Sequence, residues 1–302
     1  MKRDLLLIVG PTASGKTAMA HALTQRRPLA LLSADSQLVY RGLDIGTAKP
    51  KAADRGHWGL IDLVDPGELF SAGEFCRQAV PLVEAAWKNG LLPTFVGGTG
   101  LYLKALLHGL AEVPAIPEDL RQRLEAEFEE RGLEPLLARL DAVDPSLAAQ
   151  VDRKNPRRVL RALEVFEATG QPLSAWQQGT KPALRPERAF WLGLDPGKEA
   201  LDARIVDRVE ASFAEGWLQE TLSLQEKWGP EAVGKCAAIG YPELSEHLRG
   251  KLSLEDARQA IVQQTRAYAR RQRTWFKAQP DIHGSPSAED ALRDPALATF
   301  LS

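Results

Sequence analysis

The chain has 302 residues, of which 44% are hydrophobic and 26% are charged, a composition typical of a globular protein rather than of a disordered or membrane-embedded one. Its formal net charge is −2, so any site for a polyanion must come from local clusters of basic residues. No apolar run approaches the roughly 20 residues of a spanning helix. The two cysteines, Cys76 and Cys236, form no disulfide or zinc pattern. We expect a cytoplasmic monomer that does not enter a membrane.

The first predicted strand, residues 5–9, runs directly into a phosphate-binding loop. Residues 10–17 read GPTASGKT and match G-x-x-x-x-G-K-[ST], with a strand before the motif and a helical pattern after it. The glycines let backbone N–H groups turn toward phosphate oxygens, and the helix N-terminus adds its positive end. Lys16 supplies a point charge, and the Thr17 hydroxyl is placed to hold Mg²⁺. The residues predicted to bind phosphate are Gly10, Pro11, Thr12, Ala13, Ser14, Gly15, Lys16 and Thr17.

An acidic turn follows the second predicted strand, residues 29–32. Asp35 lies in this turn, and ligands collect at the carboxyl ends of strands in an open α/β sheet, so we expect it near the phosphate loop. Bound phosphate would repel a carboxylate unless a cation intervened. Asp35 therefore either acts as a general base on an incoming nucleophile or caps its own loop, and the spacing leaves both interpretations open.

Two more strands are predicted at residues 60–64 and 91–96. A nucleotide-hydrolysing enzyme would end such a strand in an aspartate that fixes Mg²⁺, but residues 91–96 run into Gly97-Gly98-Thr99-Gly100. Asp62 could supply that carboxylate instead, so this class of enzyme remains an alternative. The Thr99 hydroxyl could bond a leaving oxygen or merely complete the turn.

From about residue 113 the pattern changes to successive helices. One is predicted at residues 117–131, ending at Gly132, and another begins at Asn155-Pro156 and ends near Gly170. Residues 189–194 predict a strand that returns to the sheet, and a capping box at Ser253 and Asp256 predicts a final helix reaching about residue 277. We expect an α/β fold in which residues 1–112 and 187–302 form a P-loop NTPase-like parallel-sheet core. Residues 113–186 would form an inserted all-helical domain.

Two helical segments carry basic residues at helical spacing. Arg157, Arg158 and Arg161 are neighbours on the segment that begins at residue 155, and Arg266, Arg270 and Arg273 form a stripe with Lys277 on the last helix. A stripe of this kind is more often a solvated face than a nucleic-acid site, so spacing alone decides little.

Several longer blocks carry a family resemblance. They are GPTASGKT at 10–17, SADS at 33–36, DIGTAKP at 44–50, SAGEF at 71–75, GGTGLY at 97–102, NPRRVLRALEV at 155–165, IGY at 239–241 and TRAYARRQRTWF at 265–276. Together, and in this order, they resemble the tRNA dimethylallyltransferase (isopentenyl-tRNA transferase) family. The match spans nearly the whole chain and is far more specific than a lone P-loop.

The resemblance implies transfer of a dimethylallyl group from dimethylallyl diphosphate to the N6 amine of the adenosine immediately 3′ of a tRNA anticodon, with Mg²⁺ as cofactor. Asp35 matches the family's general base, Thr99 its catalytic threonine, and Arg208, with Arg204 one turn earlier, an arginine beside the reacting centre. Contact with the anticodon stem-loop is implied for Asp35, Ser36, Gln37, Leu38, Thr99, Arg121, Arg157, Arg158, Val159, Leu160, Arg161, Arg266, Arg270 and Arg273. At Leu38 many members carry glutamine instead.

Two rival functions fit the same motifs less well. A P-loop kinase of a small metabolite or nucleoside would use Asp35 to activate a hydroxyl. An RNA-binding switch would use the nucleotide site only to change conformation, and it would not need Asp35 and Thr99 to converge on the phosphate loop.

Overall fold

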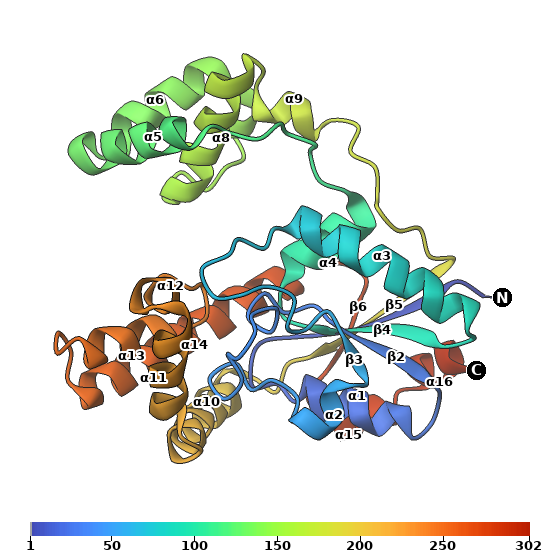
Figure 1. Cartoon of the computed structure of the whole chain (residues 1–302). Coiled ribbons are helices and arrows are strands. Elements are labelled where there is room, and N and C mark those ends of the chain that lie inside the picture. Colours follow the sequence, from blue (N-terminus) through green and yellow to red (C-terminus); the bar gives the residue numbers. More distant parts are fainter. Residues whose placement is uncertain (1) are drawn as a thin grey trace. The chain divides into compact units, whose positions relative to one another are not determined.

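The computed structural model describes residues 2–302, which form two compact units (Figure 1). Residues 2–106 and 184–302 make an α/β unit, and Leu107–Ala183 make a helical unit. Among the described residues, no helix is both long enough and apolar enough to cross a membrane.

A wholly parallel sheet forms the centre of the α/β unit, with strand order β3-β2-β4-β1-β5-β6. The strands are β1 (Asp4–Val9), β2 (Leu29–Ser33), β3 (Trp58–Gly59), β4 (Leu92–Gly97), β5 (Arg188–Leu194) and β6 (Ile282–Ser285). Every residue of β1 is buried, because the strand has a neighbour on each side and helices over each face. The predicted α/β fold is confirmed, and so are the strands expected at residues 5–9, 29–32, 91–96 and 189–194.

The strand predicted at residues 60–64 is wrong. The edge strand is β3, immediately before this segment, and Leu60 and Asp62 have φ angles of 65° and 54°. These left-handed conformations cannot continue an extended strand, so the chain turns here instead. Val64 keeps only an isolated bridge to Tyr40.

Helices cover both faces of the sheet (Figure 1). On one face lie α3 (Ala72–Lys88) and α4 (Gly100–His108), where the Phe75 ring stacks on Tyr102 at 4.4 Å between centroids. On the other face α1 (Lys16–Thr24), α15 (Ala288–Leu292) and α16 (Pro295–Leu301) share a core with β1 and β5. The short α2 (Ala52–Arg55) precedes β3.

A second group of helices packs beside the sheet and shares a separate core with residues 39–43. These helices are α10 (Lys198–Ala214), α11 (Trp217–Trp228), α12 (Pro230–Gly234), α13 (Tyr241–Leu248) and α14 (Leu254–Lys277). The predicted cap is confirmed, since the Ser253 hydroxyl accepts the Asp256 N–H at the start of α14. The expectation that α14 is the final helix is wrong, because β6, α15 and α16 follow it. With 4, 5 and 7 residues, these elements are too short to show a clear period in the sequence.

The helical unit contains α5 (Glu118–Arg131), α6 (Glu134–Val143), α7 (Pro145–Ala148), α8 (Pro156–Thr169) and α9 (Leu173–Gln177). Leu124, Leu140 and Leu163 are fully buried where α5, α6 and α8 meet. Gly132 and Gly170, with φ angles of 77° and 71°, end α5 and α8 as predicted, because glycine adopts these angles without strain.

Candidate active site

The phosphate loop joins β1 to α1 at the carboxyl end of the central strand. Gly15, the residue before α1, has a φ of 94°, and Gly10 has a φ of 146° and passes so close to the Leu194 carbonyl that a side chain would collide with it. The Lys16 ammonium folds back over the loop and donates to the Pro11 carbonyl at 2.6 Å. The buried Ser14 hydroxyl has no hydrogen-bond partner among the described residues, which leaves a polar group for an oxyanion. The loop thus has the form that its motif predicts.

Gln272 joins this loop to the turn after β4, and sequence reasoning missed it. Its side-chain oxygen accepts the Thr12 N–H at 2.8 Å, and its side-chain nitrogen donates to the Gly98 carbonyl at 3.0 Å. A side chain at Gly98 would overlap the Gln272 amide, so the fit needs a glycine there. The only signal in the sequence is one uncharged residue within a run of arginines in α14.

The turn after β2 brings Asp35 to the same end of the sheet. Its carboxylate accepts the Gln37 N–H at 2.9 Å, so Asp35 shapes its own turn and faces the site as well. The Ser36 N–H donates to the Thr99 hydroxyl at 3.0 Å, and the Thr99 N–H donates to the Ala34 carbonyl at 3.0 Å. These bonds fix the turns after β2 and β4 against each other.

Arg208 reaches this group from the middle of α10. It donates to the Thr12 hydroxyl at 2.8 Å and, through its other terminal nitrogen, to the Gly46 carbonyl at 3.4 Å. Arg204 lies 3.5 Å from the Ala13 carbonyl. Two neighbouring cavities result. The one of about 160 Å³ is lined by the predicted residues Thr12, Ala13, Gly15, Lys16, Thr17, Asp35, Leu38 and Arg208. The smaller one, about 50 Å³, is lined by Thr12, Asp35, Gln37 and Arg208 together with residues such as Tyr268 and Trp217.

The electrostatics of the site follow from burial of like charges around one carboxylate. Burial lowers the pKa of the Lys16 ammonium to about 8, although attraction to Asp35 opposes the shift. Burial also lowers the pKa of Arg208, and Asp35 opposes that shift too. Lys16 and Arg208 thus have one carboxylate, Asp35, between them, so the site carries a net positive charge that a bound anion would neutralise.

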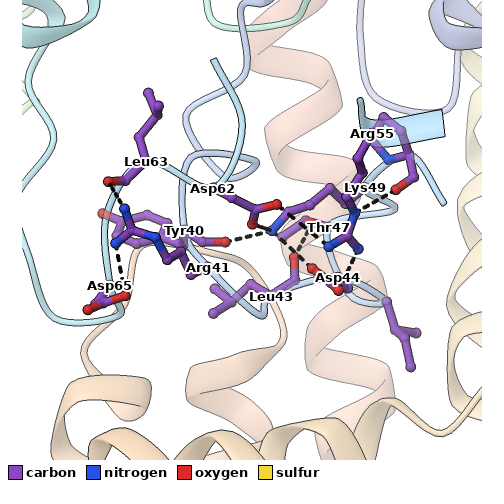
Figure 2. Close-up of polar contacts among 12 residues, drawn as sticks. Tyr40, Arg41, Leu43, Asp44, Thr47, Lys49, Arg55, Asp62, Leu63 and Asp65 are labelled. Carbon is purple, nitrogen blue, oxygen red and sulfur yellow. Dashed lines mark hydrogen bonds and ion pairs between the residues drawn. The ribbon is translucent and has the colours of Figure 1, made fainter. Parts of the chain in front are cut away.

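A loop of residues 44–49 forms another wall, and an ion cluster holds its far end (Figure 2). The Lys49 side chain is 0% exposed and donates to the Tyr40 carbonyl at 2.6 Å and to Asp62 at 2.6 Å, and it pairs with Asp44 at 3.0 Å. Arg55 pairs with the same two carboxylates, at 2.5 Å to Asp44 and 3.6 Å to Asp62. Asp62 is therefore engaged by two cations and lines neither cavity, which disfavours the nucleotide-hydrolysing alternative that required its carboxylate at the phosphate loop.

Metal ligation was predicted at Thr17. Its side chain is exposed in the first turn of α1, and it lines the same cavity as Lys16 and Asp35. No group of three or more His, Cys, Asp or Glu side chains within residues 2–302 could hold a metal ion alone. A hydroxyl and a carboxylate beside phosphate oxygens do suit Mg²⁺, which keeps several waters and takes few protein ligands.

The predicted tRNA-contacting residues of the helical unit differ in exposure. Arg157 and Arg158 are exposed on α8, whereas Arg161 pairs with Glu164 at 3.1 Å and Arg121 lies 3.9 Å from the same carboxylate. Val159 and Leu160 are 0% and 8% exposed, so their side chains belong to the core of this unit rather than to a surface for RNA. Helical periodicity places these two residues on the opposite side of α8 from the arginines.

The basic stripe on α14 is partly committed to ion pairs within the protein. Arg273 pairs with Asp195 at 2.9 Å, and Arg266 lies 3.7 Å from Asp202. Arg270 is exposed. Tyr268, on another side of the same helix, lines the smaller cavity beside Asp35.

Comparison with known proteins gives consistent matches along the whole chain. The family model described as IPP transferase matches residues 38–279, and that described as Isopentenyl transferase matches residues 3–56. A tRNA dimethylallyltransferase from Anaeromyxobacter dehalogenans is 45% identical over 92% of this chain and 93% of its own length. Another, from Syntrophobacter fumaroxidans, is 43% identical over 94% of this chain and 84% of its own length.

Solved structures resemble the chain as well. A full-length tRNA isopentenylpyrophosphate transferase from Bacillus halodurans is 34% identical, with a TM-score of 0.69, over 99% of this chain and 97% of that chain. A eukaryotic dimethylallyltransferase acting on tRNA is 26% identical, with a TM-score of 0.78, over 99% of this chain and 77% of that chain.

Proposed function

The chain belongs to the IPP transferase family, and we propose that it transfers a dimethylallyl group from dimethylallyl diphosphate to N6 of the adenosine 3′-adjacent to the anticodon in tRNA. The observation that carries this proposal is the convergence of the phosphate loop, Asp35 and Arg208 on shared cavities, with Thr99 bonded to the neighbouring turn. The proposed cofactor is Mg²⁺, and the proposed working form is a cytoplasmic monomer.

The leaving group determines what the phosphate loop must do. When the carbon–oxygen bond of the donor breaks, negative charge accumulates on the departing diphosphate. Loop residues, the Lys16 ammonium and the Arg208 guanidinium line the cavity where we propose that this charge develops, so they can stabilise it. Bound Mg²⁺, held by Thr17 and phosphate oxygens, would neutralise part of the same charge.

The nucleophile determines what Asp35 must do. The exocyclic amine of adenine is weakly nucleophilic, because its lone pair is delocalised into the ring. As the new carbon–nitrogen bond forms, the amine must lose a proton, and the Asp35 carboxylate in the cavity wall can accept it. The Thr99 hydroxyl is proposed to bond the oxygen of the leaving diphosphate.

The RNA must present an adenosine that has left its stack, which costs a few kcal/mol at most. We propose that Ser36, Gln37 and Leu38, in the turn after Asp35, contact this nucleotide, since Gln37 and Leu38 line the cavities. Exposed arginines would bind the phosphates of the anticodon stem-loop. These are Arg157 and Arg158 on α8 and Arg270 on α14, with Arg121, Arg161, Arg266 and Arg273 able to exchange their carboxylate partners for phosphate.

The deciding experiment incubates the full-length protein with dimethylallyl diphosphate, Mg²⁺ and unmodified tRNA, and then digests the RNA and weighs its nucleosides. We expect one adenosine per tRNA to gain the mass of the prenyl group. A matched tRNA with guanosine at that position should gain nothing. An unshifted adenosine mass, or phosphoryl transfer from ATP in a parallel reaction, would contradict the proposal.

A further inference from the structure

A chain of hydrogen bonds runs from Arg208 away from the cavities to a partly buried carboxylate on α11. Arg208 donates to the Gly46 carbonyl at 3.4 Å, and the N–H of Gly46 donates to the Tyr241 hydroxyl at 3.2 Å. The Tyr241 hydroxyl in turn donates to Glu220 at 2.6 Å. The chain therefore passes through a single residue, Gly46, which lies in the wall of the smaller cavity.

Glu220 also holds the start of the loop of residues 44–49. Its carboxylate accepts the N–H of Asp44 at 3.2 Å and that of Ile45 at 2.9 Å. Three consecutive peptide groups, those of residues 44, 45 and 46, are thus tied to Glu220 either directly or through Tyr241. The segment has no strand or helix of its own, so its peptide groups are held by these side chains together with the turn bonds from the Ala48 and Lys49 N–H groups to the Ile45 and Asp44 carbonyls.

The packing around Gly46 leaves it little freedom. A side chain at Gly46 would overlap the Trp217 indole, and the Tyr241 ring is 0% exposed and meets the same indole edge-on at 5.8 Å. A glutamate and a phenol placed together in such an environment must satisfy each other. Burial raises the pKa of both groups, while the N–H groups of Asp44 and Ile45 favour the charged form of Glu220.

We infer that Glu220 and Tyr241 are positioning residues for Arg208: acting through Gly46, they aim its guanidinium at the phosphate loop. Among residues 2–302, Arg208 has two acceptors, the Thr12 hydroxyl and the Gly46 carbonyl. The first belongs to the loop that would bind diphosphate, so only the second fixes the arginine from outside that loop. The inference rests on the role proposed above for Arg208.

The test is a double-mutant cycle between Tyr241→Phe and Arg208→Ala, with Arg208→Lys as a second background. Tyr241→Phe removes one hydroxyl and keeps the ring that fills the core. In the wild-type background we expect kcat to fall about 3- to 10-fold, as for the loss of the one hydrogen bond that holds Gly46, with KM for tRNA unchanged. In either Arg208 variant, adding Tyr241→Phe should lower kcat by less than about 2-fold, because the guanidinium that Tyr241 positions is no longer present.

Tyr40→Phe is the matched control. Tyr40 is also buried, and its hydroxyl donates to the Glu68 carbonyl at 3.3 Å without touching the chain to Arg208. We expect this variant to keep wild-type kcat, and both Phe variants to unfold at similar urea concentrations. A purely structural role for Tyr241 would instead give the same fold-loss of activity with and without Arg208.

A second readout keeps this inference separable from the proposed function. The dissociation constant for inorganic diphosphate is measured for the same set of variants. This binding does not require prenyl transfer. If the wild-type protein prenylates no tRNA, the proposed function fails, and coupling between Tyr241 and Arg208 in diphosphate affinity still supports the inference. Additive effects on diphosphate affinity overturn the inference, whatever the transfer assay shows.

Discussion

Two loops line the same cavities, and they keep their shapes by different means. The phosphate loop lies between β1 and α1, and its path depends on glycine conformations, main-chain contacts and one clamp, Gln272. The loop of residues 44–49 lies in the longer connection between β2 and α2 and adjoins neither element directly. It depends on the buried ammonium of Lys49 at one end and on Glu220 with Tyr241 at the other (Figure 2). The first kind of loop can be recognised from a local pattern, whereas the second depends on partners that are distant in the sequence.

Substituting Asp35 tests how much of kcat remains when the two loops are intact but the carboxylate in the cavity wall is absent. Asp35→Ala should lower kcat about 10²- to 10⁴-fold, because a positioned general base typically contributes that much. Affinity for tRNA should change little. Single-turnover prenyl transfer and a filter-binding titration measure the two quantities.

Asp35→Asn is the matched control, since it keeps the oxygen that accepts the Gln37 N–H. If both variants lose activity alike, the carboxylate acts in the chemistry rather than in the turn. Wild-type turnover in either variant would mean that the loops suffice and that the role given to Asp35 is wrong.

The fold and the phosphate loop could be predicted because their signals are local. Short apolar runs bounded by turn residues marked four strands of the sheet, and GPTASGKT marked the loop between β1 and α1. Gln272, Glu220 and Tyr241 could not be found in this way, because each acts on a segment more than 170 residues away along the chain. The partners of Asp62 are close to it in the sequence, but these ion pairs depend on the turn at Leu60 and Asp62, where a strand had been predicted.

The ion cluster of the second loop can be tested against an exposed pair beside it (Figure 2). Lys49→Met should lower the free energy of unfolding by about 3 kcal/mol, because it leaves two partly buried carboxylates with Arg55 alone. Arg41→Met breaks the pair with Asp65, whose members are 48% and 44% exposed, and should cost at most about 1 kcal/mol. Urea unfolding of both variants measures the difference. Equal losses would show that burial does not distinguish the two pairs.

The smallest expected effect concerns charge on the phosphate loop. Since burial lowers the pKa of Lys16 to about 8 in the free protein, the ammonium loses its proton as the pH rises through 8. Diphosphate favours the charged form, so binding should raise this pKa again and take up a proton above pH 8. As the pH rises above 8, affinity for inorganic diphosphate should then weaken by at most about tenfold per pH unit. Well below pH 8 Lys16 is fully charged, so its ionisation should no longer change the affinity.

Calorimetry in buffers of different ionisation enthalpy counts the protons taken up. Lys16→Met serves as the reference, because it removes the lysine and keeps the titration of diphosphate itself. Proton uptake that is the same in wild type and Lys16→Met at pH 9 would contradict this account of the loop.

The position of β1 has a consequence for synthesis of the chain. β1 pairs with β4 on one side and with β5 on the other, where Asp4 lies opposite Arg188. A nascent chain can assemble β1, β2 and β4 early, but one edge of β1 stays open until the whole helical unit and β5 have left the ribosome. The helical unit is one continuous segment of the chain with its own apolar core, so it can fold in that interval. The intermediate most in need of chaperones is therefore the one that ends just before residue 188.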